Sequence, residues 1–203
     1  VLYGNAFIAL TIKLLGILIT LAGIRLLLDN LGAAGYGKFS IYLSLVMLIA
    51  SFSQLGIPQI LVKNAARYLH LEQDGLIKGA TFYSYLLTSV AALFLSFSLF
   101  VVVPIVDEVV SLDTALLIML IVVTIFLTTN KIRFSLIRAV GRGAVSEVPE
   151  LVIRPLILYG SIIFIFAVTK DIVVASIVAL LISVVVSALI GQFIYKNSYR
   201  SKT

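Results

Sequence analysis

Long apolar stretches alternate with short polar ones along the whole chain, and most are about as long as a membrane-crossing helix. A helix needs about 20 apolar residues to cross a hydrocarbon core of about 30 Å. The pattern therefore predicts an all-α, polytopic membrane bundle of six transmembrane helices. The predicted spans are 5–28, 39–62, 80–103, 114–130, 151–169 and 172–195.

The first span contains Lys13 in the middle of an apolar run. A charge at that depth costs about 2.5 to 3.5 kcal/mol on insertion scales, so an intramembrane lysine indicates a functional group that faces the bundle interior. Small and polar residues share its helical face by steps of three and four. That face consists of Asn5, Ala9, Lys13, Gly16, Thr20 and Gly23. The alternative is a lysine whose stem snorkels toward the interface.

The second span carries a similar polar stripe that ends at Gln54 and Pro58. In lipid, the Gln54 amide needs a partner, and Pro58 frees a carbonyl that a neighbour or water must satisfy. The third and sixth spans show small residues at steps of four instead, a pattern that favours close helix packing over function. These two ridges are Ala80, Ser84, Thr88, Ala92 and Ser96, and Ala175, Ala179, Ser183, Ser187 and Gly191.

Basic residues are distributed unequally between the two sides of this predicted topology. With a cytoplasmic amino end, eleven of the fifteen Lys and Arg residues fall on the cytoplasmic side. Only Lys38 and Lys170 fall on the other side, while Lys13 and Arg25 lie inside the first span. The positive-inside rule thus predicts a multi-pass protein of the cell (inner or plasma) membrane with both termini of this segment cytoplasmic.

Two polar segments on that side are predicted to lie outside the membrane. The segment 63–78 is predicted to be a short linker. The segment 131–150 mixes arginines with apolar residues, so it is either an amphipathic helix on anionic lipid or a solvated basic loop. Glu150 and Arg154 stand four residues apart and are expected to form an ion pair.

Composition excludes several classes of protein. The chain is 62% hydrophobic and only 12% charged, so its net charge of +6 is the signature of membrane loops, with no sign of nucleic acid as a partner. It has no cysteine and one histidine, His70, without metal-ligand spacing around it. All nine carboxylates are expected in loops or at span ends, away from any acid–base site. We therefore expect no enzyme, no metal and no cofactor.

The sign of the buried charge points to the cargo. An exporter of cationic drugs would be expected to hold Asp or Glu inside a span, whereas this chain holds Lys13 and, nearer the outer end, Arg25. These cations suit an anionic cargo. Arg25 also stands four residues before Asp29, so a surface ion pair is its alternative role.

Several short motifs occur in a characteristic order. They are Leu31-Gly32-Ala33-Ala34-Gly35-Tyr36-Gly37, Leu55-Gly56-Ile57, Asn64-Ala65-Ala66-Arg67-Tyr68, Ile137-Arg138-Ala139-Val140-Gly141-Arg142, Val148-Pro149-Glu150 and Arg154-Pro155. Over about residues 5–158 the chain resembles the polysaccharide and O-antigen flippases (Wzx type) of the multidrug/oligosaccharidyl-lipid/polysaccharide exporter superfamily.

The resemblance implies a two-lobed transporter that moves a lipid-linked oligosaccharide, an O-antigen or lipopolysaccharide precursor, across the membrane by alternating access. Residues 1–203 would form the amino-terminal lobe, and the carboxy-terminal lobe would be missing from this chain. The family's cationic cavity maps onto Lys13 and Arg25, to which the polar stripes add Asn5 and Gln54 as substrate-binding candidates. Asp29 stands where family members often have a basic residue, which weakens the assignment of Arg25. Membrane lipids and a coupling cation or proton are the other expected partners.

Two other functions fit the same pattern. One is a multidrug exporter of the same superfamily. The other is a membrane scaffold without transport, whose small-residue ridges serve assembly alone.

Overall fold

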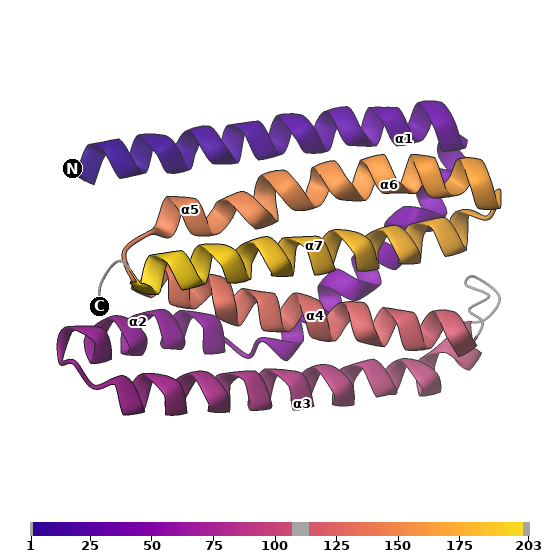
Figure 1. Cartoon of the computed structure of the whole chain (residues 1–203). Coiled ribbons are helices and arrows are strands. Elements are labelled where there is room, and N and C mark those ends of the chain that lie inside the picture. The colour runs from indigo at the N-terminus through magenta and orange to yellow at the C-terminus, as the bar shows by residue number, and fades with distance from the viewer. Residues whose placement is uncertain (1, 107–113, 201–203) are drawn as a thin grey trace.

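The computed structural model describes residues 2–106 and 114–200, and the ordered elements in these ranges are all helical (Figure 1). The fold class predicted from the sequence is confirmed. The elements are α1 (Leu2–Ser53), α2 (Ile57–His70), α3 (Asp74–Val106), α4 (Thr114–Ala139), α5 (Gly143–Val148), the π-helical turn η1 (Pro149–Ile153), α6 (Arg154–Thr169) and α7 (Ile172–Arg200).

Helix α1 contains two membrane crossings. Its 52 residues would extend about 78 Å if straight, more than twice the thickness of a hydrocarbon core. The helix breaks at Gly32, whose backbone angles of φ 68° and ψ 175° are open to glycine but not to other residues. Beyond the break, residues 33–53 pass back across the bundle (Figure 1). Five stretches are long and apolar enough to span a membrane, and the first, Phe7–Ser53, crosses twice, so the described chain makes six crossings.

A second break separates α1 from α2 inside the predicted span 39–62. Leu55 and Gly56 both have positive φ values, of 47° and 73°, and Pro58 follows in the first turn of α2. Helix α2 then continues to His70, through residues that the sequence predicted to be a linker. That prediction was wrong because Leu61 and Ala65 share one helical face, which is buried against Ile132 and Leu136 of α4.

The prediction for the segment 131–150 was also wrong. Helix α4 continues to Ala139, and α5 begins at Gly143 after a short turn. Ile132, Phe134 and Ile137 are almost completely buried. The apolar residues Ile132, Phe134 and Ile137 therefore form the inner face of a longer helix, whereas Val145 on α5 is exposed.

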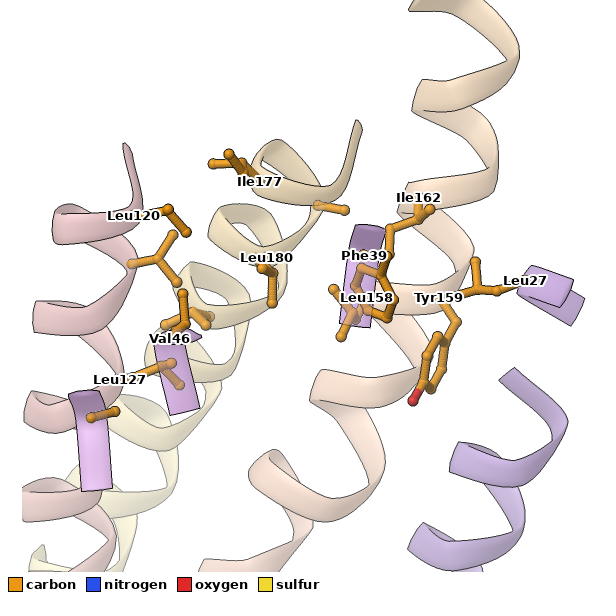
Figure 2. Packing of buried hydrophobic residues seen from close by; sticks show 14 residues of the cluster. Leu27, Phe39, Val46, Leu120, Leu127, Leu158, Tyr159, Ile162, Ile177 and Leu180 are labelled. Atoms are coloured by element: carbon orange, nitrogen blue, oxygen red, sulfur yellow. The ribbon is translucent and has the colours of Figure 1, made fainter. Parts of the chain in front are cut away.

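The main hydrophobic core joins both halves of α1 to α4, α6 and α7 (Figure 2). Leu27 and Phe39, from either side of the Gly32 break, lie near Leu158 and Ile162 of α6. Leu120 and Leu127 of α4 and Ile177 and Leu180 of α7 extend the same cluster. The ridge residues of α3 and α7 with described side chains are mostly buried, including Thr88, Ala92, Ala179 and Ser183, which agrees with the packing role predicted for them.

The small-residue face of α1 is the face that meets α6 and η1. A Cβ atom at Gly16 would lie 2.7 Å from the carbonyl oxygen of Leu151, and one at Gly23 would collide with the ring of Tyr159. Only glycine allows this approach, because backbone and ring atoms occupy the space of a side chain. The face that carries Lys13 is thus held directly against the segment that follows α5.

The two chain ends lie at the same end of the bundle. The start of α1 and the end of α7 are found there, together with the α2–α3 and α4–α5 turns (Figure 1). Of the basic residues that the sequence placed on the cytoplasmic side, Arg154 is buried and Lys131 and Arg133 are partly buried. The other eight, against two on the opposite side, still predict that this end is cytoplasmic.

We expect cysteine labelling to show both chain ends on the cytoplasmic side. The chain has no native cysteine, so single cysteines at Ala33, Lys170 and Asn197, which are all exposed, need no altered background. An impermeant thiol reagent added to intact cells should modify the first two and spare the third. Labelling of Asn197→Cys alone would contradict this topology.

We expect Gly16→Ala to destabilise the protein by about 1 to 3 kcal/mol, because the new methyl group would overlap the Leu151 carbonyl. Gly160→Ala is the matched control, since a Cβ at Gly160 meets no atom within 4 Å and alanine favours the helix. Thermal unfolding in detergent measures both. Equal stability of the two variants would show that α1 and η1 are not in close contact.

Candidate functional site

Lys13 points toward a carboxylate of the segment that follows α4. Its Nζ lies 3.7 Å from Oε1 of Glu147 on α5, and the two side chains are 55% and 26% exposed. The second carboxylate oxygen of Glu147, Oε2, is buried and has no hydrogen-bond partner in the described part of the chain. The ammonium is thus half-solvated and partly neutralised by a carboxylate of the protein.

This pairing corrects the sequence analysis in one respect. The sequence analysis placed Glu147 in the segment 131–150, outside the membrane, and so gave Lys13 no carboxylate partner. In the structure, α5, η1 and α6 form one continuous stretch, Gly143–Thr169, that is long and apolar enough to span a membrane. Glu147 and Glu150 therefore lie in the first third of this stretch, near one end of the span, and do not belong to a separate loop.

A second ion pair joins Glu150 on η1 to Lys131 on α4. Sequence spacing predicted Arg154 as the partner of Glu150, and that prediction was wrong. Both side chains of the observed pair are largely shielded, with 31% of Lys131 and 22% of Glu150 exposed. The two pairs attach this segment to α1 on one side and to α4 on the other.

Arg154 stays almost unpaired behind these two ion pairs. It is 6% exposed, its Nη2 donates a long hydrogen bond of 4.0 Å to Sδ of Met47, and its Nε has no partner in the described structure. A buried guanidinium with so few partners is costly. Its position, one helical turn after Glu150, keeps a cation beside the ion pairs.

The π-helical turn η1 sets the spacing of these charges. Pro149 opens it and cannot donate a backbone hydrogen bond, and the turn widens over the next residues to Ile153. The hydroxyl of Ser187 on α7 donates to the carbonyl oxygen of Pro149 at 3.2 Å, which fixes the turn against the core. Wide turns of this kind are frequent at functional sites.

Two cavities open on either side of the Lys131–Glu150 pair. The first, which we call the Lys13 cavity, has a volume of about 440 Å³ between α1 and the η1–α6 junction. It is lined by Lys13, Gly16, Ile17, Thr20, Leu21, Glu150, Leu151 and Pro155. Apart from the two charged groups and one hydroxyl, this lining is apolar.

The second, the Gln54 cavity, has a volume of about 360 Å³ and a more polar lining. It is formed by Gln54, Pro58, Gln59, Val62, Lys131 and Arg138. Nε2 of Gln54 donates to the carbonyl oxygen of Ala50 at 3.0 Å, which holds the amide at the break between α1 and α2. Glu150 lines the first cavity and Lys131 the second, so the ion pair stands between them.

The structure separates the four residues that the sequence predicted to bind substrate. Lys13 and Gln54 each line a cavity, but the cavities differ. Arg25 is exposed, lines neither of these cavities, and within the described ranges forms no ion pair with Asp29 or another carboxylate. Asn5 lies on α1, but its side chain is outside the described part of the structure.

Sequence reasoning missed Glu147, Glu150, Lys131 and Arg154 as members of the site. One signal was present: between Gly143 and the apolar run 151–169 no glycine interrupts the chain, and Ala144, Val145, Val148 and Pro149 are apolar. A helix that starts at Gly143 must carry both glutamates into the bundle. Their lysine partners come from distant parts of the chain, and no local spacing reveals them.

Comparison with known families decides the class of this charged, cavity-containing bundle. Residues 2–203 match the family model described as polysaccharide biosynthesis protein. The chain belongs to this family. This polysaccharide biosynthesis protein is therefore a multi-pass membrane protein, consistent with its apolar, membrane-crossing helices. The comparisons with curated proteins and with solved structures gave no match.

We expect Lys13→Ala to lower the abundance of the inserted protein several-fold, because Glu147 would be left without a cation on a membrane-crossing segment. The double variant Lys13→Ala/Glu147→Gln should restore abundance, since neither charge is then unpaired. Arg25→Ala is the matched control, a cation of the same helix without a carboxylate partner, and should leave abundance unchanged. Quantitative immunoblotting of membranes measures this. Equal losses in the single and double variants would contradict a stabilising ion pair.

Proposed function

We propose that this protein is a flippase that moves a lipid-linked oligosaccharide, the repeat unit of a surface polysaccharide, across the cell membrane by alternating access. On this proposal the described bundle is the amino-terminal lobe, and a second lobe completes the transport path. The family match over residues 2–203 supports polysaccharide biosynthesis as the process. The observation that carries the proposal is the pair of cavities beside charged groups on membrane-crossing helices.

The charge balance of this region supports an anionic cargo. Lys13, Lys131 and Arg154 face Glu147 and Glu150, so three cations stand against two carboxylates, and Arg138 at the second cavity adds a fourth cation. A lipid-linked sugar carries phosphate groups, which form charge-assisted hydrogen bonds with lysine and arginine. The excess of positive charge is smaller than the sequence suggested, because each lysine of the site has a glutamate partner.

One observation favours a drug exporter of the same superfamily as the second candidate. Glu147 and Glu150 lie on a membrane-crossing segment, where a carboxylate suits a cationic substrate or a coupling cation. A scaffold without transport has weaker support, because packing alone explains neither the two cavities nor a half-exposed lysine.

Complementation of transport tests the proposal. In a cell that lacks its own flippase, the full-length gene should restore surface polysaccharide. The double variant Lys13→Gln/Glu147→Gln should insert normally yet lower surface polysaccharide per inserted molecule by about tenfold or more, because the neutral pair cannot attract an anionic headgroup. Lys38→Gln controls for loss of an exposed cation elsewhere and should transport normally, since Lys38 is exposed and lines neither cavity.

Two results would contradict the proposal. Full transport by the neutral double variant would show that Lys13 and Glu147 carry no part of the function. Resistance to cationic drugs, without restored polysaccharide, would identify the protein as a drug exporter.

A further inference from the structure

Two charged residues of the membrane-crossing stretch from α5 to α6 each hold a buried polar atom without a partner. Three buried side-chain nitrogen and oxygen atoms in the described part of the chain lack a hydrogen-bond partner, and two of them are Oε2 of Glu147 and Nε of Arg154. An unpaired buried polar atom lowers stability, most of all on a charged group. Arg154 is only 6% exposed and forms no ion pair among the described residues. Its guanidinium therefore has an unused capacity to bind a carboxylate.

We propose that Glu150 is a mobile carboxylate that exchanges between Lys131 and Arg154. In the described state it pairs with Lys131 and links the α5–η1 segment to α4. In the second state it pairs with Arg154 on its own helix, and the ion-pair link to α4 is broken. The two states belong to this bundle whatever its cargo is, so the exchange does not rest on the proposed function.

Arg154 lies within reach of Glu150 along the same stretch of helix. The two residues stand four apart with the acid first, which is the favourable order for an ion pair on a helix. Glu150 already stabilises the charge of Arg154 electrostatically, although its ion pair in this structure is with Lys131. Glu150 thus has a cation available in either state and is never left bare.

The wide turn η1 lies between Glu150 and Arg154 and separates the two states. The backbone N–H of Arg154 donates to the carbonyl oxygen of Pro149, five residues earlier, and not to that of Glu150. A return to α-helical hydrogen bonding would move this N–H to the Glu150 carbonyl and give the two side chains the spacing of a regular helix. Ser187 also donates to the Pro149 carbonyl, at 3.2 Å. This carbonyl therefore keeps a partner when the N–H leaves it.

The second state pairs the cation that water reaches least. The contact that Arg154 would give up is weak, because its Nη2 lies 4.0 Å from Sδ of Met47 and a thioether is a poor acceptor. Lys131 would lose its carboxylate, but it is 31% exposed and lines the Gln54 cavity, where water can solvate the ammonium. The unpaired cation is then a partly exposed ammonium and no longer a buried guanidinium, which makes the second state accessible.

The reactivity of Lys131 measures the exchange, because a carboxylate paired with the amine blocks its reaction with an acylating reagent. The full-length protein, purified in detergent, is treated briefly with N-acetoxysuccinimide, and acetylation of each lysine is measured by mass spectrometry. Lys63, an exposed lysine of α2, is the internal reference. Glu150→Gln should raise the rate at Lys131 by about tenfold or more, because the amine is then always unpaired. Arg154→Gln should lower the rate by about threefold or more, because Glu150 has lost its second partner and stays on Lys131.

Two control variants separate the exchange from a general change of charge. Arg133→Gln removes another partly buried cation, two residues from Lys131 on α4, that forms no ion pair among the described residues. It should change the rate at Lys131 by less than about twofold. Arg154→Lys keeps a cation for Glu150 and should retain most of the wild-type rate. If Arg154→Gln fails to fold, Arg154→Met removes the charge with an apolar side chain that suits the buried position.

Two results would overturn the proposal. An unchanged rate at Lys131 in both neutral variants of Arg154 would show that Glu150 does not move to Arg154. Equal slowing by Arg154→Gln and Arg133→Gln would show that any nearby cation has the same effect, without an exchange of partners. Because acetylation is measured without cargo, a normal exchange in a protein that moves no polysaccharide would contradict the proposed function alone.

Discussion

A charge on a membrane-crossing helix needs a partner, and this constraint organises the packing of the α5–η1 segment against α1 and α4. Two lysines and two glutamates meet it through the Lys13–Glu147 and Lys131–Glu150 pairs. Both glutamates belong to the stretch from α5 to α6, while the lysines come from α1 and α4. The stretch from α5 to α6 is consequently held between α1 and α4 by the ion pairs of Glu147 and Glu150. The cavities on either side of the second pair follow from that arrangement, because charged side chains keep the helices apart where apolar side chains would close the gap.

A small residue helps to make these pairs geometrically possible. Gly16 lets α1 approach the backbone at Leu151, one residue after Glu150. Glu147 stands in α5 and Glu150 at the start of η1, with two residues between them. Their carboxylates nevertheless have different partners, Lys13 on α1 and Lys131 on α4. One short segment thus forms ion pairs with two helices.

The sequence analysis correctly predicted the features that depend on the periodicity of residues along a single helix. Spans, the small-residue face of α1 and the buried ridges of α3 and α7 all follow from spacing along one helix. The sequence analysis failed where the extent of a helix or the partner of a charged residue depends on contacts between distant segments. Helix α4 continues past Lys131 because Ile132 and Leu136 pack on α2. Glu150 pairs with Lys131 and not with Arg154 because α5, directly before η1, packs against α4. Polar composition alone suggested a loop at both places, since it carries no information on which apolar neighbours a basic segment will meet.

The surface of the bundle shows which face can meet lipid. Large apolar side chains of α3, such as Phe94 and Phe97, are exposed and suit acyl chains. The second half of α1 exposes Ser44 and Ser51 beside Leu48 and Phe52, which are more than half exposed. A serine hydroxyl on a helix can donate to a carbonyl oxygen of its own preceding turn, so single serines on such a face are compatible with lipid as well as with protein. The charged side chains need partners more than these hydroxyls do, which is why they lie where α1 and α4 meet the α5–η1 segment.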